Sequence, residues 1–269
     1  MADDSLSDIT CEPFTFGGET KAVYWQGSGP AIVVMTEMPG ITPAVADFAR
    51  RVVADGFMVA LPDLFGTPGR EVSQGYILRS LAKGCVSKEF VAFATGKTSP
   101  VIGWLRGLVA EAHVRSGVGE GRGVGVVGMC FTGGFSLALA VDPLVAVGVL
   151  SQPSLPLPLG PGKARRAADL GLSPADLKVV AERVAADEVC AMGLRFTADS
   201  VVPAARFETL RAALGDAFIG VEIDSSPANE HGFEKRAHSV LTEEYRDEVG
   251  FPTKDAHDLV MSHFHQRLD

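Results

Sequence analysis

The chain has 269 residues, of which 46% are hydrophobic and 21% are charged. A chain of this length buries about three quarters of its unfolded surface on folding, and this composition excludes a disordered protein. The net charge of −9 argues against nucleic acid as a partner. Non-specific binding to nucleic acid depends on lysine and arginine that neutralise phosphates, and acidic residues outnumber them here.

Four cysteines are scattered without a paired spacing, at Cys11, Cys85, Cys130 and Cys190. This pattern excludes the disulfide framework of a small secreted protein and a zinc site built from cysteines. The first residues lack the basic and apolar regions of a signal peptide, and no apolar run approaches the ~20 residues of a membrane span. We therefore expect a soluble cytoplasmic protein, a monomer or homodimer, with no membrane partner.

Short β-rich segments alternate with helical patterns along the chain. Strands are predicted at Lys21–Gln26, Ala31–Thr36, Met58–Leu61, Gly123–Val127, Ala146–Leu150, Cys190–Phe196 and Phe218–Ile223. Helices are predicted at Pro43–Ala54, Ser99–Arg115, Phe135–Val141, from Ser173 onwards, Pro203–Leu214 and Thr253–Leu268. This alternation is typical of an α/β fold, with a mainly parallel central sheet of about seven to eight strands flanked by helices.

The alternation of strands and helices is interrupted by two segments, Ser73–Thr98 and Gln152–Ala168. Each follows the carboxyl end of a predicted strand, which is the edge at which open α/β sheets bind ligands. We therefore expect one domain over residues 1–269, with the two excursions lying over the site.

The glycine-rich stretch from Gly123 to Gly128 has two interpretations. Its letters match GxGxxG, but a dinucleotide site needs those glycines after a strand, in the turn that opens a helix. Here they alternate with the valines of the predicted strand itself, so no nucleotide cofactor is expected. The favoured interpretation makes Gly128–Gly134 the sharp turn from a strand into a helix, with Cys130 at its apex.

Cys130 is the candidate nucleophile of this turn. The positive end of a helix dipole favours the thiolate, which is the reactive form of cysteine. A nucleophile elbow needs small residues two positions either side of the nucleophile, because strand and helix pass close together there. Gly128 meets this requirement, whereas Thr132 stands where a second glycine is usual. The other cysteines are interpreted as ordinary reduced thiols.

A nucleophile on such a turn is followed along the chain by an acid and then by a histidine. Asp199 lies in a loop directly after the predicted strand Cys190–Phe196. Two histidines follow the last predicted strand and compete for the role of base, His238 and His231. His238 is preferred and His231 is the alternative. The histidines of the last helix do not share one face, so no metal site is expected.

These residues together resemble the dienelactone hydrolase family. The resemblance runs over nearly the whole chain, from about Lys21 to Arg267, and rests on the turn with Glu37, the glycine-flanked Cys130, Asp199 and His238. It implies an α/β-hydrolase fold in which Cys130 is the nucleophile, His238 the base and Asp199 the carboxylate that orients it.

The same resemblance assigns roles to the turn after the predicted strand Ala31–Thr36. Glu37 would contact the resting thiol and help to deprotonate it when substrate enters. The backbone N–H groups of Met38 and Phe131 would form the oxyanion hole. In this family, arginines bind a carboxylate group of the substrate. The sequence departs from that pattern, because no arginine closely follows His238. Arg79 is the candidate for a second such arginine.

The expected function is hydrolysis of a carboxylic ester or lactone through a thioester acyl-enzyme. The partner is a small-molecule substrate, and no cofactor is implied. The alternative is a non-catalytic protein of the same fold, in which Cys130 serves ligand binding or thiol sensing. The two differ in whether turnover requires the Cys130 thiol.

Overall fold

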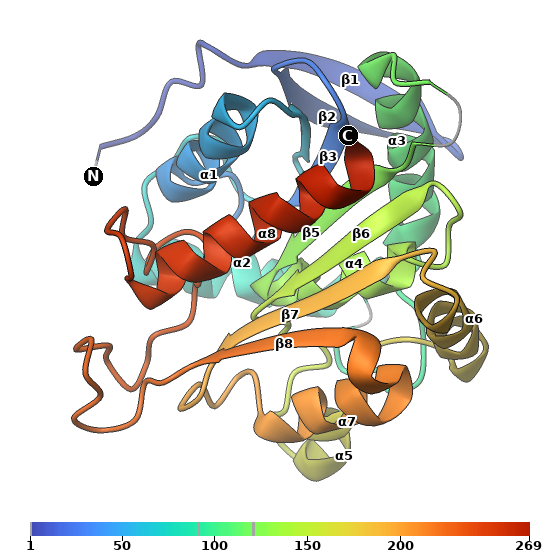
Figure 1. The fold of residues 1–269 in the computed structure, drawn as a ribbon. Helices are drawn as coiled ribbons and strands as arrows, with labels where there is room; N and C mark the ends of the chain where they lie inside the picture. Colours follow the sequence, from blue (N-terminus) through green and yellow to red (C-terminus); the bar gives the residue numbers. More distant parts are fainter. Residues whose placement is uncertain (1, 91, 120–121) are drawn as a thin grey trace.

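One sheet of eight strands organises the described part of the chain, residues 2–90, 92–119 and 122–269 of the computed structural model. The strands are β1 (Thr10–Phe16), β2 (Glu19–Gln26), β3 (Ala31–Met35), β4 (Met58–Pro62), β5 (Val124–Met129), β6 (Val145–Ser151), β7 (Cys190–Phe196) and β8 (Phe218–Ile223). Their order across the sheet is β1-β2-β4-β3-β5-β6-β7-β8 (Figure 1). The pairs β1–β2 and β2–β4 are antiparallel and the other neighbours are parallel. The predicted fold class is confirmed.

Helices cover both faces of this sheet (Figure 1). They are α1 (Pro43–Ala54), α2 (Gln74–Val86), α3 (Val101–Ser116), α4 (Gly133–Leu139), α5 (Lys163–Ala168), α6 (Pro174–Ala185), α7 (Ala204–Leu214) and α8 (Pro252–Leu268). Apolar side chains of α1 and α8 pack into the core on one face, and those of α3, α4, α6 and α7 pack into the core on the other. None of the helices in the described ranges is both long and apolar enough to cross a membrane.

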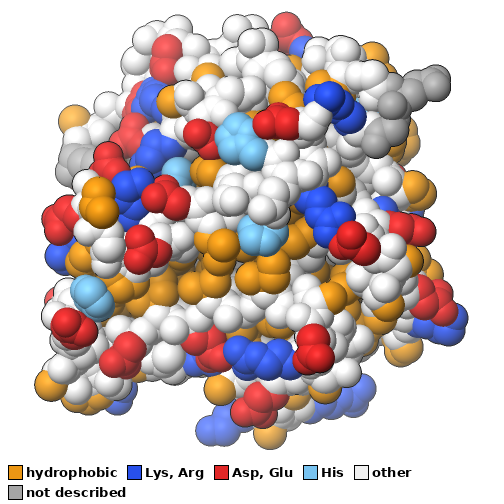
Figure 2. All heavy atoms as spheres, in the orientation of Figure 1, with side chains coloured by type: hydrophobic (Ala, Val, Ile, Leu, Met, Phe, Trp, Pro, Cys, Tyr) orange, Lys and Arg blue, Asp and Glu red, His pale blue; other side chains and the backbone are white. Residues whose placement is uncertain are grey.

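The core reaches the surface beside α8. Figure 2 shows a band of hydrophobic side chains between α8 and the strands β7 and β8. Ile219 and Val221 of β8 and Leu259 of α8 are partly buried at the edge of the core on this face. The last helix therefore leaves part of the sheet edge without cover.

Two predicted helix starts owe their position to side-chain caps. The Thr42 hydroxyl accepts the backbone N–H of Val45 at 3.3 Å at the start of α1. The Ser173 hydroxyl accepts the N–H of Asp176 at 3.1 Å at the start of α6. In both helices a proline follows the cap in the first turn, where its missing N–H costs no intrahelical hydrogen bond.

The structure contains elements that the sequence pattern did not predict. β1 is an edge strand whose side chains are exposed or only partly buried, so it lacks the alternation of a half-buried strand. Helix α2 lies inside the first excursion, and its Gly75 and Gly84 weaken the helical signal. Helix α5 lies in the second excursion and buries none of its residues. β1 and α5 thus lack periodic burial. α2 does bury every fourth residue, at Tyr76, Ser80 and Gly84, but a serine and a glycine at these positions give no apolar signal in the sequence.

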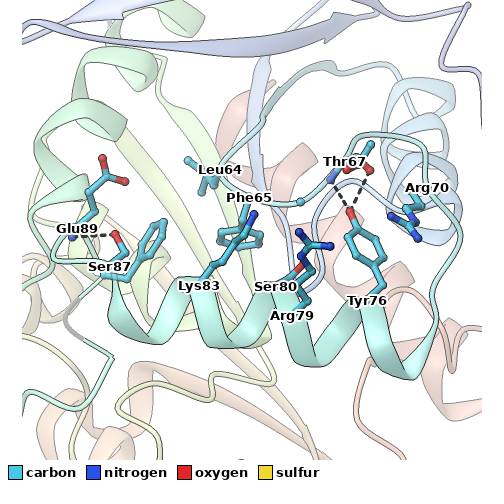
Figure 3. Close-up of a pocket in the computed structure, with 13 residues that line it drawn as sticks. Leu64, Phe65, Thr67, Arg70, Tyr76, Arg79, Ser80, Lys83, Ser87 and Glu89 are labelled. Carbon is cyan, nitrogen blue, oxygen red and sulfur yellow. Dashed lines mark hydrogen bonds between the residues drawn. The ribbon is translucent and has the colours of Figure 1, made fainter.

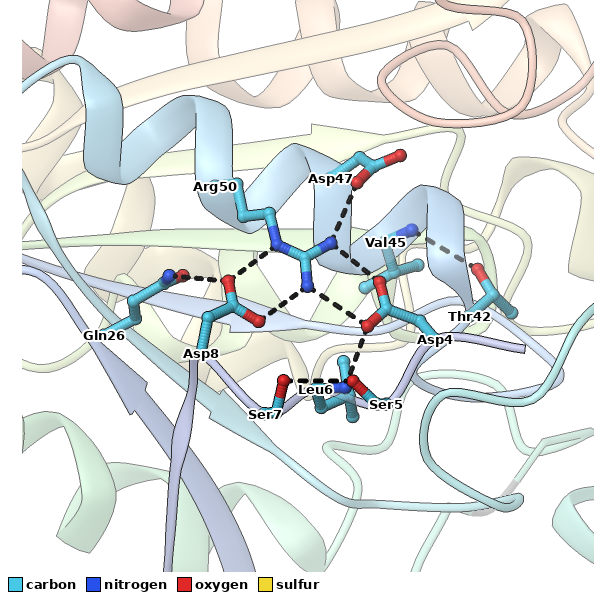
Figure 4. A network of polar contacts seen from close by, with 10 residues as sticks. All are labelled: Asp4, Ser5, Leu6, Ser7, Asp8, Gln26, Thr42, Val45, Asp47 and Arg50. Atoms are coloured by element: carbon cyan, nitrogen blue, oxygen red, sulfur yellow. Dashed lines mark hydrogen bonds and ion pairs between the residues drawn. The ribbon is translucent and has the colours of Figure 1, made fainter. Parts of the chain in front are cut away.

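The N-terminal segment is attached to α1 by one guanidinium group (Figure 4). Arg50 pairs with Asp4 at 2.7 Å, with Asp8 at 2.8 Å and with Asp47 at 2.9 Å. Both Asp4 and Asp8 receive two hydrogen bonds from its planar fork. These hydrogen bonds lower the pKa of Asp8 from 3.8 to about 2, and they lower the pKa of Asp4 as well.

Replacing Arg50 by glutamine should lower the free energy of unfolding by roughly 1 kcal/mol at pH 7, the scale of a well-formed surface ion-pair network. Because folding depresses the pKa values of Asp4 and Asp8, the network stabilises the fold above about pH 4. That stabilisation is lost as the pH falls towards 2. Urea unfolding of both proteins at pH 7, 4 and 2.5 measures the effect.

The matched control for this prediction is Arg106→Gln, which removes a more exposed arginine whose one carboxylate partner among the described residues is Asp142. It should destabilise less than Arg50→Gln at pH 7. A difference between wild type and Arg50→Gln that stays constant from pH 7 to 2.5 would contradict the assignment of the stabilisation to the two carboxylates.

Candidate active site

Three predicted site residues follow three parallel strands of the sheet. Cys130 comes directly after β5, Asp199 follows β7, and His238 lies in the long segment after β8. The carboxyl ends of parallel strands meet at one edge of the sheet, where ligands bind in open α/β folds. All three residues line one hollow of about 460 Å³, here called the Cys130 cavity.

Cys130 occupies a strained turn. Its φ of 50° lies in the left-handed region, which a residue with a side chain rarely adopts. A Cβ at Gly128 would overlap the carbonyl oxygen of Thr132, and one at Gly133 would lie 2.5 Å from Cα of Pro153. Gly128 is therefore required by the close passage of β5 and α4, and Gly133 by the packing of α4 against the segment after β6. This is the geometry of a nucleophile elbow.

Thr132, which stands where a second glycine is usual, connects the elbow to the neighbouring strand. Its hydroxyl lies 2.9 Å from the carbonyl oxygen of Met35 and 3.2 Å from that of Thr36, and it accepts the N–H of Met129 at 3.0 Å. The side chain is completely buried. The threonine therefore fits because its side chain points towards the end of β3 and away from the crossing of β5 and α4.

His238 is held by Asp199. Its Nδ1 lies 2.5 Å from Oδ2 of Asp199, while Oδ1 of the same carboxylate accepts the N–H of Val201 at 2.8 Å. Burial of the imidazole disfavours its charged form, but interactions with Cys130 and Asp199 outweigh burial and raise the pKa of His238 well above 6.5. The geometry thus favours an imidazolium between two acidic side chains.

His231, the alternative base, lies elsewhere. Its ring packs edge-on against Phe251 at 5.5 Å between centroids, and it lines a separate hollow with Val221 and Leu259. It does not line the Cys130 cavity. The structure therefore pairs Asp199 with His238.

Glu37 is buried and held by three donors. The hydroxyl of Ser239 donates to its Oε2 at 2.6 Å, the amide of Gln152 donates to the same atom at 3.1 Å, and the hydroxyl of Thr242 donates to Oε1. The family resemblance implies that this carboxylate contacts the resting thiol. The described hydrogen bonds of Glu37 come from Ser239 and Thr242, in the segment after His238, and from Gln152, at the start of the second excursion.

The thiol has a different polar neighbour. Sγ of Cys130 lies 3.6 Å from the hydroxyl of Ser154, whose backbone N–H donates to the carbonyl of Cys130 at 2.9 Å. Ser154 belongs to the second excursion, which the sequence analysis expected to lie over the site. No chemical motif in the sequence distinguished this serine from other loop residues.

Of the two residues expected to form an oxyanion hole, one shares a cavity with Cys130 and the other follows it in the chain. Met38 lines the Cys130 cavity, and Phe131 is the second residue of the short 3₁₀ turn η1 (Cys130–Thr132). Backbone N–H groups in the first turn of a helix lack intrahelical acceptors. The Phe131 ring is buried against Phe65 and Phe90, at 5.8 and 5.4 Å between centroids, which fixes the position of its backbone.

Arg79 does not line the Cys130 cavity. It lies on the opposite face of α2, in a separate cavity described below (Figure 3). The cations that do line the Cys130 cavity are Lys235 and Arg236, just before His238. Their position could not be predicted from the sequence, because the long segment between β8 and His238 has no periodic pattern that would orient its side chains.

The second excursion is fastened by a buried arginine of α7. Arg206 donates to the backbone carbonyls of Pro153, Pro156, Arg166 and Asp169, at distances from 2.5 to 3.0 Å. Burial lowers its pKa to about 10. Because the guanidinium satisfies four carbonyl groups of one irregular segment, it fixes the wall of the site that contains Ser154.

Comparison with known proteins agrees with this architecture. The model of the dienelactone hydrolase family matches residues 19–267. The chain belongs to the dienelactone hydrolase family. Membership of this family supports hydrolysis of an ester or lactone. The search of curated proteins found no match.

Several solved structures share the fold of the chain at low sequence identity. A dienelactone hydrolase from Anabaena variabilis is 15% identical, with a TM-score of 0.56 over 97% of this chain and 98% of that one. A dienelactone hydrolase-like promiscuous phosphotriesterase from metagenomic libraries is 16% identical, with a TM-score of 0.59 over 98% and 100%. A cold-adapted esterase from an Arctic intertidal metagenomic library is 16% identical, with a TM-score of 0.56 over 99% and 97%.

Replacing Glu37 by alanine should lower the free energy of unfolding by about 2–3 kcal/mol, because buried donors on Ser239, Thr242 and Gln152 lose their charged acceptor. The segment that carries His238 should also loosen, so we expect kcat to fall even well below the melting temperature. Chemical unfolding and ester turnover at 15 °C measure the two effects.

Glu243→Ala is the control for this prediction. It removes the same charge from the same cavity, but Glu243 is exposed. Its stability should be close to that of the wild type. If Glu37→Ala and Glu243→Ala were equally stable, the described hydrogen bonds of Glu37 would not hold the segment after His238.

Proposed function

We propose that the protein hydrolyses a carboxylic ester or lactone by nucleophilic catalysis, with Cys130 as nucleophile, His238 as base and Asp199 as its orienting carboxylate. The observation that carries the proposal is the 2.5 Å contact between His238 and Asp199 beside the thiol of a strained elbow. Strain of this kind is retained where it exposes a reactive group.

The first half of the reaction forms a thioester. The Cys130 thiolate attacks the carbonyl carbon, and the carbonyl oxygen becomes an oxyanion that accepts hydrogen bonds from the N–H groups of Met38 and Phe131. Each such donor contributes roughly 3–4 kcal/mol of transition-state stabilisation in enzymes of this type. As the tetrahedral intermediate collapses, the carbon–oxygen bond breaks and the His238 imidazolium protonates the leaving alkoxide.

The second half returns the free enzyme. Neutral His238 takes a proton from water, and the resulting hydroxide attacks the thioester carbon. The carbon–sulfur bond then breaks, releasing a carboxylic acid and restoring the thiolate and imidazolium. Asp199 stabilises the imidazolium and keeps Nε2 directed towards the reacting atoms.

The lining of the Cys130 cavity favours a substrate with an apolar body. Apolar side chains from α2, the second excursion and the loop after β7 surround it, namely Ile77, Leu81, Leu157 and Val201. A volume of about 460 Å³ suits a small ester or lactone. We propose that this apolar wall holds the acyl or alkyl group while the ester carbonyl lies at Cys130.

Replacing Cys130 by alanine should reduce turnover of small aryl esters by at least 10³-fold, because the covalent route is lost. His238→Ala should reduce it by a comparable factor. Cys11→Ala and His231→Ala are the matched controls, since Cys11 is an exposed thiol and His231 lines a separate hollow. Both controls should keep most of the activity, measured by release of the phenol from aryl acetates and butyrates.

Full turnover in Cys130→Ala would overturn the proposed function. Absence of turnover in the wild type across a panel of esters and lactones would favour the non-catalytic alternative. Iodoacetamide labelling then distinguishes a reactive thiol from a structural one, because an activated Cys130 should react faster than Cys11, Cys85 or Cys190.

A further inference from the structure

A second cavity lies on the opposite face of α2 from the Cys130 cavity. Its walls are α2, the segment 64–70 after β4 and the segment 87–90, and its volume is about 460 Å³ (Figure 3). Ile77 and Leu81 of α2 line the Cys130 cavity, whereas Arg79 and Lys83 line this one. The helix therefore separates two hollows, and a ligand in one leaves the other accessible.

Three cations line this second cavity, here called the basic cavity. Arg79 and Lys83 are four residues apart on one face of α2, and Arg70 lies opposite, with its guanidinium 4.7 Å from the centre of the Tyr76 ring. None of the three has a carboxylate within ion-pair distance among the described residues. In a chain of net charge −9, such a group of unpaired cations is unexpected.

Two helix lysines elsewhere in this chain do have carboxylate partners. Lys254 pairs with Asp258 at 2.9 Å, and Lys178 pairs with Glu182, each four residues along the same helix. The carboxylate that lines the basic cavity does not neutralise it, because Glu89 is bound by the ammonium group of Lys21 at 3.2 Å. The positive charge of the basic cavity therefore faces an open volume.

Hydroxyl and aromatic groups complete the basic cavity. Ser80 is buried on α2 between the two cations, and the described residues provide no hydrogen-bond partner for its hydroxyl. Phe65 and Phe90 form an apolar wall, with ring centroids 5.7 Å apart. The Tyr76 hydroxyl is already bonded to the backbone of Thr67, which holds the segment after β4 against α2.

We propose that the basic cavity binds a small phosphomonoester with an aromatic or apolar body. A phosphomonoester carries a charge of about −1.5 to −2 at pH 7 and three acceptor oxygens. These match the donors of Arg70, Arg79 and Lys83, and arginine is well suited to bidentate contact with phosphate. The body of the ligand packs against Phe65 and Phe90. A monocarboxylate would leave part of the positive charge uncompensated.

Calorimetric titration of the full chain at pH 7.5 and low salt tests the proposal, with phenyl phosphate as probe and inorganic phosphate and benzoate as comparisons. Phenyl phosphate should bind with one-to-one stoichiometry. Inorganic phosphate should bind more weakly because it lacks the ring, and benzoate at least tenfold more weakly because it has one charge. Equal affinity for benzoate and phenyl phosphate would overturn the assignment to phosphate.

The double variant Arg79→Gln with Lys83→Gln should raise the Kd for phenyl phosphate at least tenfold. The matched control is Lys163→Gln with Arg165→Gln, which removes two exposed positive charges from α5 without touching either cavity. It should leave the Kd within twofold of the wild type. If both double variants lost affinity for phenyl phosphate equally, the effect would come from the overall charge of the protein, and the proposal would be overturned.

A third double variant, Lys235→Gln with Arg236→Gln, distinguishes the two cavities because both residues line the Cys130 cavity. It should retain phenyl phosphate binding. Loss of binding here, with retention in the Arg79 and Lys83 variant, would assign the anion to the Cys130 cavity and overturn the proposal. Neither result depends on ester turnover, so failure of this proposal is distinguishable from failure of the proposed function.

Discussion

The close passage of β5 and α4 at Cys130 is the constraint on which the site depends. The strand must turn into the helix so tightly that no Cβ is accommodated at Gly128, and Cys130 takes a left-handed backbone conformation. This conformation is costly for a residue with a side chain, and packing around the turn must maintain it. Thr132 contributes to that packing by bonding to the last carbonyls of β3. The elbow and the turn that carries Met38 are thereby joined.

The segment that carries His238 has no regular structure, and polar contacts hold it in place. Glu37 accepts hydrogen bonds from Ser239 and Thr242, and Arg51 of α1 donates to the carbonyl of Leu241 at 2.7 Å. These contacts fix the backbone directly after the imidazole. A buried carboxylate is tolerable there because three donors compensate for its lost hydration.

The sequence alone predicted the elements whose burial is periodic and the residues whose position in the chain order is fixed. Strands such as β3 and β5 are continuous apolar runs, and Cys130, Asp199 and His238 follow strand ends in the order expected of this fold. The sequence did not predict α2, because Gly75 and Gly84 dilute its pattern. Arg79 was expected near the substrate, but the orientation of α2 places its side chain in the basic cavity. The partners of Glu37 come from more than a hundred residues away, and no local pattern encodes such a contact.

The central claim is that Cys130, His238 and Asp199 act as one proton-sharing unit, and NMR titration of the His238 ring tests it most directly. In the wild type, the pKa of His238 should lie above 6.5, because the Cys130 thiolate and Asp199 stabilise the imidazolium. In Cys130→Ala the thiolate is gone, so the pKa should fall. An unchanged pKa in that variant would contradict the account, because it would mean that the thiol and the imidazole do not interact.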